Sequence, residues 1–354
     1  MKILITGGCG FLGTSVALQA APTGHDVALF DNLRRVGSAE NLRLLEGAGR
    51  SRFHHGDIRS PGDVSAVIRE VRPDAILHFA GQVAMTTSIE QPRLDCETNI
   101  IGTLNVLEAV RQDAPDSMVL FASTNKVYGD LESLRVEEQE KRYVLPDYPS
   151  GVPEGVGLDF RSPYGVSKGA ADQYVLDYHR VYGLRTAVFR HSSMYGVNQH
   201  ATFDQGWIGW FCQKAVEQAA DRGASAFSIS GNGKQVRDIL YADDICSLYF
   251  AAMDRIDQVS GEAFNIGGGM GNSLSLLELF DLLEGIVSTR LRFEHKPVRT
   301  SDQKVFVADL AKAERLLGWT PKIGKAEGIE AVIRWLRRRS PETGATLTEQ
   351  VHVP

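Results

Sequence analysis

Cysteine is scarce in this sequence, and long apolar runs are absent. The four cysteines, Cys9, Cys96, Cys212 and Cys246, lie far apart, with no C-x-x-C pair and no Cys/His cluster at metal-ligand spacing. We therefore expect reduced thiols and no structural zinc. No apolar run approaches the roughly 20 residues that a membrane-spanning helix needs, and the chain enters a strand-like segment directly after Met1, which fits no signal peptide. These absences make the cytoplasm the expected compartment and a membrane partner unexpected.

Basic stretches are also scarce. The chain has 38 Lys and Arg residues against 44 Asp and Glu, for a formal net charge of −6. The one basic cluster, Arg337 to Arg339, is typical of a solvated helix end, so we expect no nucleic-acid partner. With 354 residues, of which 43% are hydrophobic and 23% charged, the chain has the composition of a globular protein with one large domain or two.

The most informative stretch is the first thirteen residues. Residues 2–6 form a segment too apolar for a strand with one wet face, which suits the middle of a parallel sheet. Gly7, Gly10 and Gly13 follow at intervals of three, and a helix should begin at Phe11-Leu12. This spacing permits a tight turn, close approach of a pyrophosphate and close helix–strand packing, and the helix N-terminus offers free N–H groups. The stretch predicts a dinucleotide-binding turn; a strand-turn-helix without a ligand is the alternative.

An acidic residue follows the next apolar segment. The segment Asp26–Phe30 ends at Asp31, which comes 18 residues after Gly13. A carboxylate about 20 residues beyond the last glycine is what the ribose diol of NAD requires. Arg34 and Arg35 beside this acid suit the 2′-phosphate of NADP, but Asp31 would repel that phosphate. The sequence therefore favours NAD.

Strand-like and helix-like segments alternate through the first half of the chain. This alternation indicates an α/β fold, a doubly wound parallel sheet of the Rossmann type that binds ligands at the carboxyl ends of its strands. At these ends, Asp57 and Ile58 are placed to hold and flank an adenine, or Asp57 simply begins a helix. The small residues Ala80-Gly81 let the chain pass close to a cofactor. We predict strands at 2–6, 26–30, 52–54, 75–79, 118–121 and 186–191, and helices at 99–111 and 162–182.

Beyond residue 195 the alternation fades, which predicts a second, smaller lobe. We predict an NAD-binding domain over 1–195, to which 236–267 returns, and a substrate-binding lobe over 196–235 and 268–354. Segment 130–163 contains a charge run followed by several prolines and glycines. It is predicted as a long loop, either a lid or contact surface or a mobile insertion.

Three short motifs gain meaning together. Tyr164 and Lys168 are four residues apart on a predicted helix, so their side chains share one face. The glycine turn, Ser123-Thr124 at a strand end and Tyr164-x-x-x-Lys168 jointly resemble the extended short-chain dehydrogenase/reductase family of sugar-nucleotide epimerases. The resemblance covers nearly the whole chain. Segments 80–88, 123–132 and 204–211 are similar to the branch of this family that inverts C2 of CDP-hexoses.

The resemblance implies a cofactor, a substrate and a set of site residues. It implies NAD, a CDP-sugar of the paratose, tyvelose or glucose type, and a homo-oligomer, either a dimer or a tetramer. The catalytic residues would be Thr124, Tyr164 and Lys168. Cofactor contacts would come from Gly7, Gly10, Phe11, Leu12, Gly13, Asp31, Asn32, Arg35, Asp57, Ile58, Phe79, Ala80, Gln82, Asn99, Ser123, Tyr164, Lys168 and His191. Substrate contacts would come from Thr124, Asn125, Ser193, Arg237, Arg299 and Asp302.

The implied chemistry is a transient oxidation. Oxidising a sugar carbon to a ketone removes its stereocentre, and returning hydride to the other face restores it inverted. Tyr164 would act as general base. Its free pKa is about 10, and the positive charge of Lys168 one turn away should lower that value. Thr124 would hydrogen-bond the same sugar oxygen.

The substrate residues carry a second expectation. Arg237 and Arg299 would grip the diphosphate while the sugar rotates to present its other face. Arg237 could instead pair with Asp238 or Asp243. Ser193 stands where the family usually has Asn, a departure that suits a different sugar orientation.

Other readings of the motifs remain. A 4,6-dehydratase of this family has Thr-Asp-Glu at the strand end, whereas the run here is Thr124-Asn125-Lys126, with no carboxylate. A 4-epimerase shares all the chemistry, and only the sugar pocket separates it from a 2-epimerase. An NADPH-dependent reductase is disfavoured by Asp31. A non-catalytic NAD-sensing protein would be expected to have lost Tyr164 or Lys168.

Overall fold

A sheet of seven parallel strands dominates the computed structural model, which describes residues 1–49, 51–202, 205–221, 223–297 and 303–339. The inner strands are mostly buried, the edge strand β3 (Ser51–His55) is partly exposed, and every pairing between neighbours is parallel. This confirms the predicted α/β doubly wound sheet. In spatial order the strands are β12 (Glu262–Ile266), β8 (Arg185–His191), β5 (Met118–Thr124), β4 (Ala75–His78), β1 (Lys2–Thr6), β2 (Asp26–Asp31) and β3 (Ser51–His55).

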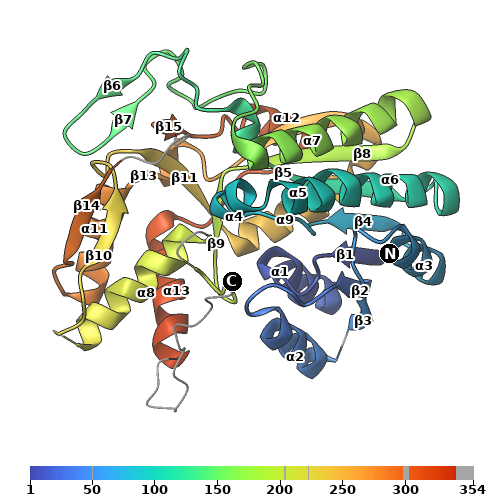
Figure 1. The fold of residues 1–354 in the computed structure, drawn as a ribbon, viewed down its shortest axis with the longest axis horizontal. Coiled ribbons are helices and arrows are strands. Elements are labelled where there is room, and N and C mark those ends of the chain that lie inside the picture. The colour runs from blue at the N-terminus through green and yellow to red at the C-terminus, as the bar shows by residue number, and fades with distance from the viewer. Residues whose placement is uncertain (50, 203–204, 222, 298–302, 340–354) are drawn as a thin grey trace.

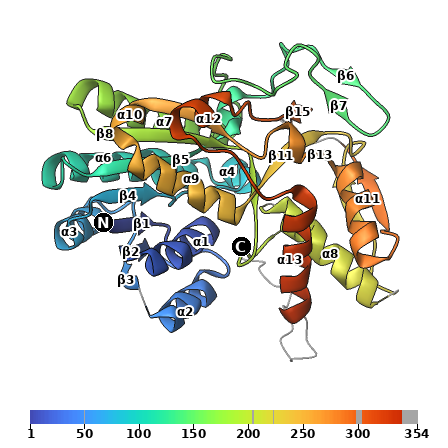
Figure 2. The ribbon, with the colours of Figure 1, turned by 180° about the vertical axis from the view of Figure 1, so that it is seen from behind.

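Helices cover both faces of this sheet (Figures 1 and 2). Alternate residues of each strand enter two separate apolar cores, one on each face, as the two-residue period of a strand requires. One face carries α1 (Phe11–Ala20), α2 (Ser38–Ala48), α9 (Ala242–Asp254), α10 (Ile256–Val259) and α12 (Ala311–Leu317). The other carries α3 (Pro61–Val71), α6 (Gly102–Asp113) and α7 (Ser162–Tyr182).

Short helices connect the strand ends near the expected site. The helix predicted over 99–111 begins as a π-helical turn, η2, and continues as α6. The short connecting elements are η1 (Ala21–Thr23), α4 (Met85–Glu90), α5 (Pro92–Cys96), η2 (Glu97–Ile101) and η3 (Asn125–Tyr128).

The segment predicted as a long loop packs against the rest of the molecule. It contains a small antiparallel hairpin of β6 (Glu137–Glu138) and β7 (Tyr143–Val144). Its apolar residues, including Leu145 and Val152, join a core with Phe306 from the C-terminal part of the chain. This packing accounts for the position of the segment along the top of Figure 1.

A second lobe is built on β11 (Val236–Tyr241), which pairs with β9 (Ser193–Tyr195), β13 (Ser273–Ser275) and β15 (Val305–Phe306). Within the segment 236–267, residues 262–266 join the main sheet as β12, whereas residues 236–241 form the central strand of the second lobe. The domain boundaries stay a prediction. The other elements of the lobe are β10 (Phe227–Ser230), β14 (Phe293–Lys296), α8 (Trp207–Ala220), η4 (Met270–Asn272), α11 (Leu276–Val287) and α13 (Lys325–Arg339).

Candidate functional site

The glycine turn lies at the carboxyl end of β1 and leads into α1. Gly7 has a φ of 67°, and a Cβ there would lie 2.7 Å from the backbone nitrogen of Ala80. A Cβ on Gly13 would lie 2.4 Å from the carbonyl oxygen of Gly7. The turn can therefore close only with glycine at these positions, and it presents the first N–H groups of α1, Phe11 and Leu12 among them, beyond the end of the sheet. This cradle fits the pyrophosphate of a dinucleotide.

Asp31 is held beside this turn at the end of β2. Its two carboxylate oxygens accept hydrogen bonds from the backbone N–H of Cys9, at 3.0 Å, and of Leu33, at 2.8 Å. Burial raises the pKa of Asp31, and these hydrogen bonds oppose that rise. The carboxylate is thus fixed where a ribose would lie. Arg35 lies on the exposed turn that precedes α2.

The residues predicted around the adenine form one polar group. Asp57 accepts hydrogen bonds from Asn32 at 2.9 Å and from the guanidinium of Arg59 at 2.7 and 3.0 Å. The Arg59 guanidinium holds the pKa of Asp57 well below its usual range. Asp57 is not the helix cap considered as its alternative, because Ser60 caps α3. Ile58 is buried close to the start of α6, where a Cβ on Gly102 would meet its side chain.

The nicotinamide side of the predicted site is organised by Asn99. The Asn99 side chain accepts from the backbone N–H of Gln82 at 2.9 Å and donates to the Gln82 carbonyl at 3.0 Å. Phe79 and Ala80 precede this contact at the end of β4, and Phe79 packs edge-on against Tyr249. The structure thus brings these four predicted cofactor contacts to one strand end.

The three predicted catalytic residues meet at the carboxyl end of β5. The hydroxyl of Thr124 and the phenol of Tyr164 share a hydrogen bond. Lys168 is buried, and its ammonium donates to the carbonyl of Ala122 at 2.6 Å and lies 4.1 Å from the centre of the Phe121 ring. Thr124 at the end of β5 and one turn of α7, with Tyr164 and Lys168, therefore supply the three predicted catalytic side chains.

The electrostatics of this group differ from the sequence prediction. Burial raises the pKa of Tyr164 to about 12; the hydrogen bond with Thr124 opposes the rise, and the charge of Asp95 adds to it. Burial lowers the pKa of Lys168 to about 7. The expected lowering of the Tyr164 pKa by Lys168 is therefore wrong for this structure, because the ammonium points to the Ala122 carbonyl and a buried carboxylate acts on the phenol.

Ser123 and His191 have structural partners. The Ser123 hydroxyl donates to Asp172 at 2.7 Å, and Asp172 forms a buried ion pair with Arg190. His191 lies beside Thr124 across the β5–β8 pairing, and its Nε2 lies 2.8 Å from the hydroxyl of Tyr249. Its Nδ1 has no hydrogen-bond partner among the described residues.

The predicted substrate residues are only partly placed. Asn125 donates to Gln303 at 3.2 Å, and the hydroxyl of Ser193 accepts from the indole of Trp207 at 3.1 Å. Arg237 is half-buried on β11 and donates to the carbonyl of Val236. The last two predicted contacts, Arg299 and Asp302, lie outside the described residues.

Sequence reasoning missed Asp95, which lies at the centre of these contacts. The carboxylate accepts from Gln82 at 2.8 Å and from Asn99 at 3.2 Å. A signal was present, because Asp95 precedes Asn99 by four residues and thus shares its helical face. Without the fold, this spacing does not show whether the carboxylate is buried or solvated.

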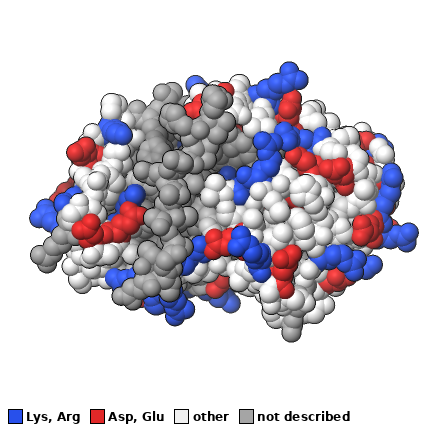
Figure 3. Space-filling view, turned by 60° about the horizontal axis from the view of Figure 1, so that its bottom comes forward, with Lys and Arg blue, Asp and Glu red and all other residues white. Residues whose placement is uncertain are grey.

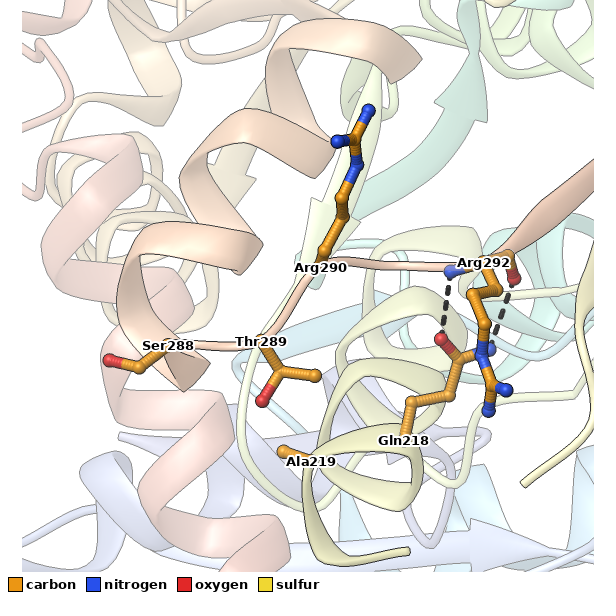
Figure 4. A pocket seen from close by; sticks show the side chains of 6 residues that line it. All are labelled: Gln218, Ala219, Ser288, Thr289, Arg290 and Arg292. Atoms are coloured by element: carbon orange, nitrogen blue, oxygen red, sulfur yellow. Dashed lines mark hydrogen bonds between the residues drawn. The ribbon is translucent and has the colours of Figure 1, made fainter. Parts of the chain in front are cut away.

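A pocket of about 450 Å³ lies elsewhere, at the end of the second lobe (Figure 4). The Gln218 side chain accepts from the Arg292 N–H at 2.9 Å and donates to the Arg292 carbonyl at 3.0 Å, and the Arg292 guanidinium donates to Ala224. These polar groups satisfy one another. The pocket collects none of the predicted site residues; it is lined by Gln218, Ala219, Ser288, Thr289, Arg290 and Arg292.

Three further observations concern partners. Among the described residues, no group of three or more His, Cys, Asp or Glu is placed to hold a metal ion. In the same part of the chain, no helix combines the length and the apolar character that crossing a membrane demands. On the face shown in Figure 3, Lys and Arg side chains lie beside Asp and Glu across the described surface.

Comparison with known proteins gives the family. The model of the family described as GDP-mannose 4,6 dehydratase matches residues 4–332. The CDP-paratose 2-epimerase of Salmonella typhi is 55% identical over 336 residues, which cover 95% of this chain and 99% of that protein. The UDP-glucose 4-epimerase of Thermotoga maritima, solved with UDP-glucose, has a TM-score of 0.82 at 29% identity, covering 96% of this chain and 99% of that one. The Thermus thermophilus UDP-glucose 4-epimerase in complex with NAD has a TM-score of 0.79 at 27% identity, covering 95% and 99%. The chain therefore belongs to the family described as GDP-mannose 4,6 dehydratase, and it shares its fold with the two solved UDP-glucose 4-epimerases.

Proposed function

We propose that this protein is an NAD-dependent epimerase that inverts C2 of a CDP-hexose of the paratose and tyvelose type. The observation that carries the proposal is the meeting of Thr124 and Tyr164 in one hydrogen bond, with Lys168 one turn away, at the carboxyl end of β5, which β4 alone separates from the strand that leads into the glycine turn. The substrate class is supported by the 55% identity to a CDP-paratose 2-epimerase along nearly the whole chain.

The residues present fit NAD. The Gly7–Gly13 turn and the start of α1 would hold the pyrophosphate, and Asp31 would hold the adenosine ribose. The hydrogen-bonded pair of Gln82 and Asn99 would fix the backbone that faces the nicotinamide half. When bound, NAD accepts a hydride from the sugar carbon and returns it. A solved relative at 27% identity holds NAD, which supports the same cofactor here.

The chain's own residues would move the proton. Thr124 holds the phenol of Tyr164 and would orient the sugar hydroxyl beside it. Tyr164 then takes the hydroxyl proton, which requires its pKa to fall from about 12 as the site fills. Lys168 lies one helical turn away with its ammonium on the Ala122 carbonyl. We propose that the ammonium turns toward the phenol as the site fills and lowers the pKa of Tyr164 there.

The substrate contacts, oligomeric state and location remain predictions. Arg237, Arg299, Asp302, Asn125 and Ser193 are the proposed contacts to the CDP-sugar. We expect a homo-oligomer in the cytoplasm, as the family resemblance and the composition suggest. A 4,6-dehydratase activity is disfavoured because the run after Thr124 contains no carboxylate.

An NMR assay of product stereochemistry tests the proposal. The purified protein is incubated with CDP- and UDP-hexoses in deuterated water. Inversion at C2 of a CDP-hexose without deuterium incorporation is expected, because the migrating hydrogen returns from the cofactor. Inversion at C4 of a UDP-sugar alone, loss of water or extensive deuterium incorporation would each overturn it.

The variant Tyr164→Phe isolates the proton transfer. It should lose turnover by at least about 100-fold, the usual scale of a general base, while retaining bound dinucleotide by absorbance. The matched control is Tyr174→Phe, an exposed tyrosine on the same helix, which should keep normal turnover. Near-normal turnover in Tyr164→Phe would remove the assignment.

A further inference from the structure

Asp95 is a buried carboxylate without an ion pair. Its residue exposure is 1%, on the short helix α5, and no ion pair to it occurs among the described residues. Its Oδ1 accepts the two amide hydrogen bonds from Gln82 and Asn99. Its Oδ2 has no hydrogen-bond partner in the described part of the chain. A buried charge is costly unless another charge or polar group compensates it, so the position calls for an explanation beyond packing.

The surroundings of Lys168 explain why a carboxylate is buried at position 95. The ammonium lies close to the side chains that Asp95 holds, because a Cβ on Gly81 would lie 3.0 Å from the Asn99 side-chain oxygen and 3.8 Å from the Lys168 Nζ. The titratable groups coupled to this ammonium are Asp95 from α5, Asp172 from α7, His78 from β4 and His191 from β8, and Tyr164 lies one turn away on α7. Burial, with a smaller contribution from Lys168, lowers the pKa of each histidine to about 3, so both histidines are neutral. The negative charges near Lys168 are therefore Asp95 and Asp172.

The two carboxylates are not equivalent. Asp172 forms hydrogen bonds of 2.9 Å from each of two guanidinium nitrogens of Arg190 and also accepts from Ser123. Its charge is thus already balanced by a cation. Asp172 raises the pKa of Lys168 more than Asp95 does, but Asp95 has only neutral donors, so Lys168 is the cation that compensates its charge in this low-dielectric interior.

We infer that Asp95 is a positioning residue of the reaction: its carboxylate orders Gln82 and Asn99 beneath the cofactor and keeps the ammonium of Lys168 charged. This inference rests on the proposed function. The same carboxylate disfavours the Tyr164 phenolate, so it raises the affinity of both members of the catalytic pair for their protons. Asp95 does not contact the substrate; it acts on the reaction through Gln82, Asn99 and Lys168.

The test is the charge of Lys168 in the protein as purified, with its bound dinucleotide. Lysine labelled with ¹³C at Cε is titrated by NMR, and the Lys168 signal is assigned as the one missing in Lys168→Arg. In Asp95→Asn the midpoint should fall by about one pH unit, the usual scale for removing a nearby charge. The control is Glu97→Gln, which removes an exposed carboxylate two residues away and should leave the midpoint unchanged.

Activity gives a second readout. In Asp95→Asn the pH profile of kcat should move to lower pH, because both Lys168 and Tyr164 lose protons more readily. An unmoved Lys168 midpoint, or a loss of kcat that is equal at every pH, would reduce Asp95 to a structural role and overturn the inference. If Asp95→Asn does not fold, Asp95→Ser makes the same charge change with a smaller side chain, and Asp95→Glu should restore the wild-type midpoint.

The two proposals fail separately. The lysine titration needs no substrate, so it decides the role of Asp95 even if the wild-type protein epimerises no CDP-hexose. Conversely, epimerisation by the wild-type protein together with an unmoved midpoint in both neutral variants would retain the proposed function and reject this inference.

Discussion

At the scale of single residues, the closest contacts in the site are those that only glycine allows. Gly13 lies in the first turn of α1, and its backbone touches the turn it has just left. A Cβ at this position would lie 2.4 Å from the Gly7 carbonyl oxygen and 2.7 Å from the Gly8 Cα. Neither backbone atom can rotate aside as a side chain could. The close packing at Gly13 therefore fixes how near the start of α1, which forms the predicted pyrophosphate site, lies to the end of β1.

We predict that Gly13→Ala weakens both folding and cofactor binding. The added methyl group must push α1 away from β1, which should cost about 1–3 kcal/mol of unfolding free energy. Urea unfolding and the absorbance of bound dinucleotide measure the two effects. The control is Gly47→Ala in α2, where a Cβ meets nothing within 4 Å; it should stabilise by about 0.5–1 kcal/mol. Equal stability and full dinucleotide content in Gly13→Ala would contradict the packing argument.

At the scale of elements, Arg142 makes the most extensive of several contacts that attach the β6–β7 hairpin to the second lobe, beside those of Lys234 with Glu138 and with the backbone of Tyr143. The guanidinium of Arg142 donates to both carboxylate oxygens of Glu278, at 2.8 and 2.7 Å, and also reaches Ser273. Glu278 is the third residue of α11 and belongs to the capping box that begins this helix. Its carboxylate accepts a hydrogen bond from the backbone N–H of Ser275. The hairpin and the helix start therefore share one ionic group.

Arg142→Ala should release this hairpin. We expect a loss of about 1–2 kcal/mol, because the ion pair is two-pronged but its side chains are still 20% and 30% exposed. Limited proteolysis should cut the segment 131–147 faster than in the wild type. Lys141→Gln is the control, since its pair with Asp281 is half exposed and should matter little. Unchanged cleavage in Arg142→Ala would show that the apolar core and the contacts of Lys234 hold the segment without this ion pair.

The elements also show what could be predicted from the sequence. Most strands of the main sheet were predictable because they are apolar runs followed by small or acidic residues, and the helix predicted from 162 to about 182 is α7. The strands of the second lobe were not, because β9, β13 and β15 have two or three residues each and exist only through pairing with β11. The Tyr164 pKa was predicted with the wrong sign, because sequence spacing places Lys168 on the same face but does not fix where its ammonium points.

At the scale of the whole molecule, one buried carboxylate on the central strand of the second lobe binds two other segments of the chain, one of which follows the main sheet. Asp238 is fully buried on β11, and its Oδ2 accepts from the backbone N–H of Gly269 at 3.0 Å and of Ala308 at 3.1 Å. Gly269 follows β12 of the main sheet, and Ala308 follows β15. A Cβ on Gly267 would lie only 1.9 Å from this carboxylate. The chain thus passes between the two sheets in direct contact with a single side chain.

This arrangement predicts how stability depends on pH. Burial raises the pKa of Asp238 from 3.8 to about 6, and its hydrogen bonds oppose that rise. The folded protein therefore binds this proton more tightly than the unfolded chain, so the contribution of Asp238 to stability falls as the pH rises from about 4 to about 6 and is constant above. The full difference amounts to about 3 kcal/mol. Asp238→Asn cannot ionise, so the wild-type unfolding free energy minus that of the variant should decline by this amount across the interval. Chemical denaturation of both proteins from pH 4 to pH 8 measures the difference and cancels the titration of every other group. A difference that stays constant over this range would mean that Asp238 remains ionised in the fold, held by the two N–H groups despite its burial.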